Sequence, residues 1–173
     1  MNNIKDIIEK IGAYQIFTNL LPGAFFCLGL QVFLSESYTL GNIGTDLVAC
    51  YFIGYLINRL GSLVIEGLCK RIKLIEFSSY SDYIKAESID AKIATLSETN
   101  SYLRSLLTSI LLIPPTVLLD FLRQKWPWFN NSWKWFIIII VILILVFSYK
   151  KNTDYIRRRV EIIIEEVTSK EKQ

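Results

Sequence analysis

Twelve consecutive residues near the C-terminus, from Phe136 to Phe147, carry no polar side chain. A helix needs about 20 largely apolar residues to cross a bilayer, where a lone strand would leave its backbone unpaired. Isoleucine and valine dominate this run, but its length favours a helix. Three further stretches are long and apolar enough. We therefore predict an all-α integral membrane protein with four transmembrane helices, at residues 16–34, 47–68, 103–122 and 133–149.

The composition supports a membrane protein and argues against an enzyme. Hydrophobic residues make up 52% of the chain and the mean hydropathy is +0.37, whereas soluble domains of this size need more charged surface. The chain has no histidine, which excludes histidine bases, triads and metal ligands. The cysteines, Cys27, Cys50 and Cys69, stand alone, and no glycine-rich phosphate loop occurs. We expect no catalytic residues, no metal and no cofactor.

The distribution of lysine and arginine predicts the orientation in the membrane. The loop 69–102 carries five of these residues and the tail 150–173 carries seven, whereas the loop 35–46 carries none. Short basic loops stay on the cytoplasmic side, so both termini and the central loop are expected in the cytoplasm. The predicted parts are an interfacial amphipathic helix (1–15), a first transmembrane hairpin (16–68), a cytoplasmic helical loop (69–102), a second hairpin (103–149) and a cytoplasmic C-terminal helix (150–173).

Four tryptophans cluster around the second outer loop. Indole rings prefer the headgroup region of a bilayer because one edge is polar and the rest is apolar. We predict that they are interfacial anchors, and an aromatic ligand-binding surface is the alternative. The residues are Trp126, Trp128, Trp133 and Trp135.

The second predicted span contains Arg59 next to Asn58, and Glu66 lies near its inner end. A charge inside the bilayer is expensive and calls for a partner. In a regular helix the Arg59 side chain tilts outward, away from the cytoplasm, and Glu66 lies roughly 10 Å further along the same face. The first span offers Asn19 nearby. We predict a buried polar clamp of Asn19, Asn58, Arg59 and Glu66; an ion or sensing site, or a partner from a neighbouring subunit, is the alternative.

Small residues in the second span predict close helix packing. Gly54, Gly61 and Ser62 would let other helices approach the backbone. The pair Pro114–Pro115 predicts a kink or break in the third span.

The C-terminal tail has the pattern of an interaction helix. Ile156, Val160, Ile163 and Val167 recur at spacings of four, three and four, which forms a heptad-like apolar stripe. We predict a partner-binding surface that also includes Arg157, Arg158 and Arg159. The alternatives are packing on the chain's own cytoplasmic helix and contact of the arginines with anionic lipid, and direct nucleic-acid binding is not expected.

Several segments carry a family resemblance: IFTNLLPG at residues 16–23, GYLINRLGSLVIE at 54–66, YSDYIKAE at 80–87, and a run containing Asp90, Lys92, Leu96, Ser97, Glu98, Asn100 and Arg104. Over about half of its length the chain resembles the KwaA family, the small four-span membrane subunits of the Kiwa anti-phage defence system of bacteria. The resemblance implies a homo-oligomer in the bacterial inner membrane that acts with a soluble cytoplasmic effector that binds DNA. It carries no catalytic residues over to this chain.

The combined expectation is a membrane-embedded sensor and scaffold, not an enzyme. The outer loops are only about a dozen residues long, so an external signal must act on them or on the spans themselves. Perturbation of the envelope would shift the packing of the spans, and the cytoplasmic helices would carry that shift to the effector. The alternative is an oligomeric ion channel or membrane-disrupting effector in which Asn58, Arg59 and Thr108 line a pore.

Overall fold

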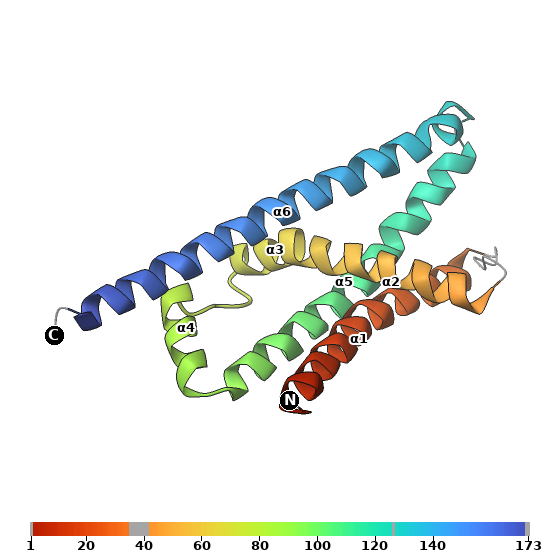
Figure 1. Cartoon of the computed structure of the whole chain (residues 1–173). Helices are drawn as coiled ribbons and strands as arrows, with labels where there is room; N and C mark the ends of the chain where they lie inside the picture. Colours follow the sequence, from red (N-terminus) through yellow and green to blue (C-terminus); the bar gives the residue numbers. More distant parts are fainter. Residues whose placement is uncertain (1, 35–41, 126, 172–173) are drawn as a thin grey trace.

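The structure, a computed structural model, describes residues 2–34, 42–125 and 127–171. All regular structure within these ranges is helical (Figure 1). Four of the helical segments described are long and apolar enough to cross a membrane, which confirms the predicted fold class: Ile16–Phe33, Ile43–Arg71, Lys92–Lys125 and Trp133–Glu165. The elements are α1 (Asn2–Phe33), α2 (Ile43–Leu60), a π-helical turn η1 (Gly61–Ile65), α3 (Glu66–Arg71), α4 (Tyr80–Ile89), α5 (Lys92–Lys125) and α6 (Pro127–Glu171).

Local signals in the sequence set the helix ends. The Oδ1 atom of Asn42 accepts a hydrogen bond from the Gly44 amide at 3.1 Å, and this caps α2. The Oγ atom of Ser79 caps α4 in the same way. At the end of α3, Lys73 adopts a left-handed conformation with φ 57°, and its amide and that of Leu74 donate to carbonyls in the last turn. This Schellman-type ending turns the chain away from the second span.

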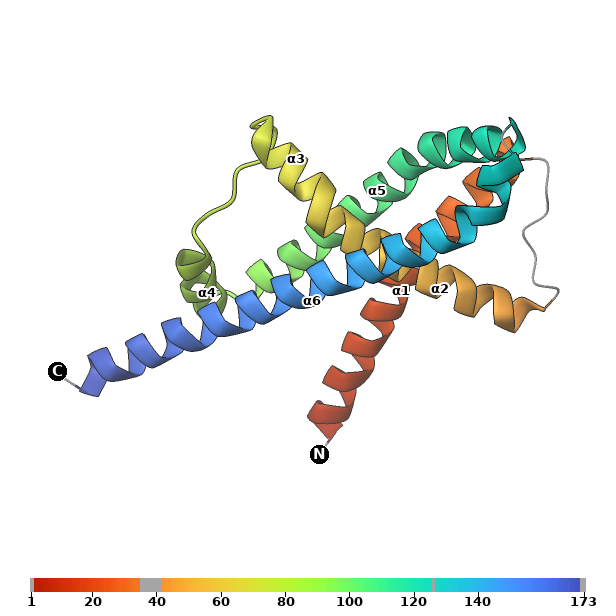
Figure 2. The ribbon, with the colours of Figure 1, turned by 90° about the horizontal axis from the view of Figure 1, so that it is seen from above.

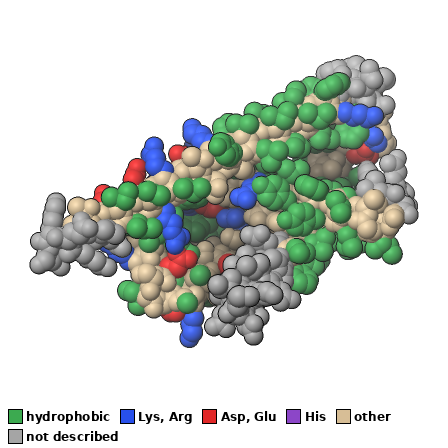
Figure 3. All heavy atoms as spheres, in the orientation of Figure 1, with side chains coloured by type: hydrophobic (Ala, Val, Ile, Leu, Met, Phe, Trp, Pro, Cys, Tyr) green, Lys and Arg blue, Asp and Glu red, His purple; other side chains and the backbone are tan. Residues whose placement is uncertain are grey.

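The spans α1, α2 and α5 form the packed part of the molecule, and α6 crosses them with looser packing (Figures 1 and 2). From its junction with α5, α6 runs past α2 and η1 and continues well beyond the other spans toward the C-terminus. The short helix α4 lies beside this extension. On the face drawn in Figure 3, charged side chains gather over α4 and the C-terminal part of α6, whereas apolar side chains cover the N-terminal part of α6.

Paired glycines bring the backbones of α1 and α2 into contact. A Cβ atom added to Gly54 would collide with the carbonyl of Asn19, and one added to Gly23 would collide with the carbonyl of Cys50. Gly61 lets α5 approach the second span just as closely, because a Cβ atom on Gly61 would lie 2.6 Å from Oγ1 of Thr108. The close approach predicted from Gly54 and Gly61 is therefore present.

Small polar residues fill much of the centre of the bundle. The α5 residues Ser105, Thr108 and Ser109 are fully buried. Their hydroxyls donate to carbonyls of their own helix, at 2.9, 2.7 and 2.7 Å respectively, so none is left unsatisfied. Large apolar side chains such as Phe52 and Ile110 point outward. This arrangement is typical of helices that pack within lipid, where the surroundings are as apolar as leucine.

The prolines inside α1 and α5 do not interrupt these spans. The helix α5 continues through Pro114–Pro115, and α1 continues through Pro22, which is fully buried beside Gly23. The break allowed for in the third span is absent.

We predict that Gly54→Ala destabilises the protein, because the added methyl group collides with backbone that has no freedom to move. Overpacking of this kind typically costs about 1–3 kcal/mol, so the midpoint of thermal unfolding of the detergent-solubilised protein should fall.

Gly67→Ala is the matched control. Nothing lies within 4 Å of the added Cβ atom at this exposed helical position, and alanine there should raise stability by up to about 1 kcal/mol. An equal loss of stability in both variants would contradict the α1–α2 packing described here.

Candidate functional site

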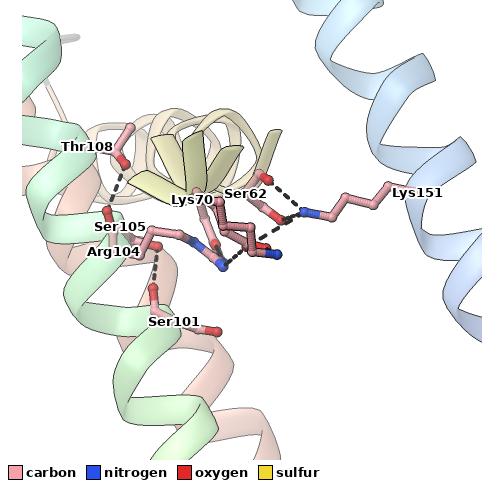
Figure 4. Close-up of polar contacts among 9 residues, drawn as sticks. Ser62, Lys70, Ser101, Arg104, Ser105, Thr108 and Lys151 are labelled. Carbon is pink, nitrogen blue, oxygen red and sulfur yellow. Dashed lines mark hydrogen bonds and ion pairs between the residues drawn. The ribbon is translucent and has the colours of Figure 1, made fainter. Parts of the chain in front are cut away.

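The carboxylate of Glu66 is the centre of the main polar site. Glu66 is only 8% exposed. Three cations surround its carboxylate, and Figure 4 labels them as Lys70, Arg104 and Lys151. Oε1 lies 3.0 Å from Nζ of Lys70. Oε2 lies 2.8 Å from Nη1 of Arg104 and 3.6 Å from Nζ of Lys151. Because these cations come from α3, α5 and α6, one carboxylate joins three elements that are far apart in the sequence.

Hydrogen bonds extend the site to the remaining spans. Nη2 of Arg104 donates to Oδ1 of Asn58 at 3.4 Å, and Nδ2 of Asn58 donates to Oδ1 of Asn19 at 3.2 Å. Nζ of Lys151 donates to both the carbonyl oxygen and the hydroxyl of Ser62, at 2.6 and 2.8 Å. Each of the four spans thus contributes at least one side chain. We call the set the Glu66 cluster: Asn19, Asn58, Ser62, Glu66, Lys70, Arg104 and Lys151.

The π-helical turn explains why Lys151 binds at Ser62. The amide of Glu66 donates to the carbonyl of Gly61, five residues back, and not to the carbonyl of Ser62 as it would in an α-helix. The Ser62 carbonyl therefore lacks its usual amide donor and accepts from the lysine of α6. Such π turns are frequent at functional sites.

The same turn corrects the sequence-based placement of Arg59. Seven residues complete about two turns of an α-helix, which would put Arg59 and Glu66 on one face. A π turn holds more residues, so the two side chains diverge. The guanidinium of Arg59 lies 5.0 Å from the ring centre of Tyr55, and no ion pair joins it to another described residue. Asn19, Asn58 and Glu66 lie in the cluster, but its arginine is Arg104.

The Glu66 cluster has an excess of positive charge. It holds three cations and one carboxylate, and its other members are neutral amides and a hydroxyl. Among the described residues, no three His, Cys, Asp or Glu side chains gather into a metal-binding group. The ion pairs hold the helices together, since each cation that moves away leaves the charge of the buried carboxylate less compensated.

The C-terminal half of α6 binds α4 on one face only. The rings of Tyr80 and Tyr155 lie 5.5 Å apart, Nη2 of Arg159 lies 3.5 Å from Oε2 of Glu87, and Ile84 of α4 is buried. Arg157 pairs instead with Glu161, one turn along α6, at 3.4 Å.

The predicted apolar stripe points away from α4. Ile156, Val160 and Ile163 are 58%, 49% and 46% exposed, and the side chain of Val167 lies outside the described residues. Packing on the chain's own helix therefore occupies the face of Tyr155 and Arg159 and leaves the stripe open.

No family model, curated protein or solved structure matches this chain. The resemblance to the KwaA family remains a prediction from sequence.

Two of the four tryptophans predicted as interfacial anchors have side chains within the described residues. Trp133 lies under the guanidinium of Arg123, which is 5.4 Å from its ring centre, and Trp135 is 70% exposed. Trp126 and the side chain of Trp128 lie outside the described residues. Thr108, the third residue proposed for a pore, is fully buried against Gly61 within the chain.

We predict that Glu66→Gln destabilises the bundle, because it leaves Lys70, Arg104 and Lys151 without their shared anion. Those side chains are 47%, 19% and 27% exposed. Breaking a fully buried ion pair costs about 3–5 kcal/mol and an exposed one about 0–1 kcal/mol, so we expect a loss of about 1–3 kcal/mol. Thermal unfolding in detergent measures it.

The control is Glu161→Gln, which makes the same chemical change in the exposed pair with Arg157. It should alter stability by no more than about 0.5 kcal/mol. If the two glutamine variants unfold at the same temperature, Glu66 does not hold the bundle together.

We further predict that Arg104→Ala is more harmful than Arg59→Ala. Arg104 binds both Glu66 and Asn58. Arg59 contacts the Tyr55 ring, and its buried Nε atom has no hydrogen-bond partner among the described residues. Loss of the ring contact should cost about 0–1 kcal/mol. The opposite ranking in the same unfolding assay would restore Arg59 as the arginine of the clamp.

Proposed function

We propose that this protein is a non-enzymatic membrane sensor and scaffold of a bacterial anti-phage defence system. In this proposal it forms a homo-oligomer in the inner membrane, with both termini and α4 in the cytoplasm. Perturbation of the envelope displaces α6 relative to the other spans. The cytoplasmic part of α6 transmits the displacement to a soluble effector that binds DNA.

The charge distribution supports the orientation. The helix α3, which carries Glu66 and Lys70, lies with α4 and the C-terminal part of α6 toward the same end of the molecule (Figure 1). Most of the lysines and arginines of the chain belong to the segments at that end. Since basic segments stay on the cytoplasmic side, the cluster belongs at the inner interface.

The continuity of α6 is the observation that carries the proposal. One helix runs from Pro127 to Glu171 without a break, with Lys151 in the Glu66 cluster and the exposed apolar stripe further along. Lys151 and Glu171 are roughly 30 Å apart along the helix axis. A change of tilt at the membrane level is therefore amplified at the cytoplasmic end.

The packing of α6 supports its role as the moving part. Only 6% of the apolar, membrane-spanning stretch of α6 is buried inside the chain, compared with 28% for that of α1. Few side chains have to separate when α6 shifts, and most of the polar attachment depends on Lys151 and on the contacts with α4. Elements that move in signalling are drawn from the loosely packed parts of a protein.

The channel alternative has less support. Thr108 is buried against α2 and η1, and Arg59 lies over Tyr55, so neither residue faces an aqueous path within one protomer. If triggering collapsed the membrane potential before any effector acted, the channel proposal would replace the sensor proposal.

We predict that substituting Ile156, Val160 and Ile163 together by serine abolishes capture of the cytoplasmic effector, because these exposed residues supply its apolar contact. Lys151→Met should leave capture intact but abolish protection against phage, because α6 is then released from Ser62 and Glu66. Affinity capture from cells that express the full-length tagged protein with its effector, and plaque counts on the same strains, provide the two readouts.

Glu161→Gln is the control for the stripe, since it alters an exposed residue of the same helix outside the stripe. Unchanged capture by a chain that lacks both residues 155–173 and residues 76–101 would overturn the scaffold proposal. Full protection by the Lys151→Met variant would overturn only the proposal that displacement of α6 transmits the signal.

A further inference from the structure

A cavity of about 310 Å³ lies between η1 and one face of α6, next to the Glu66 cluster. Its lining changes character along the helix. Leu63 and Phe147 form an apolar end, and Phe147 is the last residue of the apolar run in α6. Basic residues follow within the next three turns. The full lining is Leu63, Phe147, Lys150, Lys151, Asp154, Tyr155 and Arg158.

Two cations in this cavity have no ion-pair partner within the part of the chain that the structure describes. In the arginine run of α6, Arg157 pairs with Glu161 and Arg159 pairs with Glu87. Arg158, between them, lines the cavity and makes no such pair, and the same holds for Lys150. Lys151 is already bound to Ser62 and Glu66.

The cavity and the Glu66 cluster together hold more positive than negative charge. Five basic side chains face two carboxylates, those of Glu66 and Asp154. Such an excess favours a bound anion, because an anion at this place is attracted by several cations at once. The basic side chains are Lys70, Arg104, Lys150, Lys151 and Arg158.

We propose that the cavity binds an anionic phospholipid of the inner leaflet. The phosphate lies between Lys150 and Arg158, and the acyl end of the lipid lies against Leu63 and Phe147. Basic pockets between helices at the cytoplasmic interface suit such headgroups. The apolar end of the lining favours a lipid over a soluble phosphate or a nucleic acid, because neither has an apolar part to place there. The site depends on insertion in the membrane but not on the sensor function.

Native mass spectrometry tests the site on the full-length protein. The protein is released from nanodiscs containing equal amounts of phosphatidylglycerol and phosphatidylcholine, and the lipids retained per protomer are counted. The wild type should retain phosphatidylglycerol selectively. Arg158→Gln should weaken retention roughly 5-fold, and Arg158→Gln with Lys150→Gln roughly 30-fold, given about 1 kcal/mol per basic residue near a membrane surface.

Arg157→Gln is the matched control. It removes the same charge from the neighbouring position, but Arg157 does not line the cavity, so retention should change less than about 2-fold. Asp154→Asn should increase retention, because it removes the carboxylate closest to the phosphate site; misfolding would not produce a gain.

Three outcomes would overturn the proposal. Equal losses in Arg157→Gln and Arg158→Gln would mean that only the overall charge of the tail matters. Full displacement of the lipid by millimolar inorganic phosphate would mean that the site binds a soluble anion. Equal retention of both lipids by the wild type would mean that no anionic site exists. None of these results bears on effector capture, so the proposed lipid site and the proposed sensor function can be refuted independently.

Discussion

One buried carboxylate, that of Glu66, determines how the spans of this protein meet. An ionised carboxylate taken out of water is costly unless cations and hydrogen-bond donors compensate it. Here the compensation comes from α3, α5 and α6 at the same time. The positions of Arg104 and Lys151 relative to the second span are therefore fixed by electrostatics, and Arg104 carries the constraint on to Asn58 and, through Asn58, to α1.

Shape complementarity makes this polar arrangement possible. Lipid tails are as apolar as the side chains that face them, so burial of apolar surface gives little drive for helices to associate. Gly23 and Gly54 allow α1 to touch α2, and Gly61 admits Thr108 of α5 one turn from Glu66. Larger residues at these positions would separate the backbones and move the donors away from the carboxylate. The small residues and the charges therefore act as one packing unit.

The spans, and three of the four clamp residues named from sequence, could be found because each leaves a local signal. Long apolar runs define the helices, and Asn19, Asn58 and Glu66 are polar residues in costly positions. The role of Arg104 had no such signal, since a cation at the end of a span is an ordinary flanking residue. The same is true of Lys151. Arg59 was misplaced because a regular α-helical period was assumed through residues 61–65, where a π turn changes the face.

The π turn also links the proposed lipid site to the proposed motion of α6. It directs the Glu66 amide to Gly61 instead of Ser62, whose carbonyl accepts from Lys151, and the cavity lined by Leu63 and α6 lies directly beside that contact. The cavity is formed by Leu63 of η1 together with α6, so it is complete only when α6 is docked, and an anionic lipid seated in it binds that state more tightly. By thermodynamic reciprocity, the bound lipid then stabilises the docked state by the same free energy. On this argument, a change in the inner leaflet would reach the effector through the same helix as a disturbance of the spans.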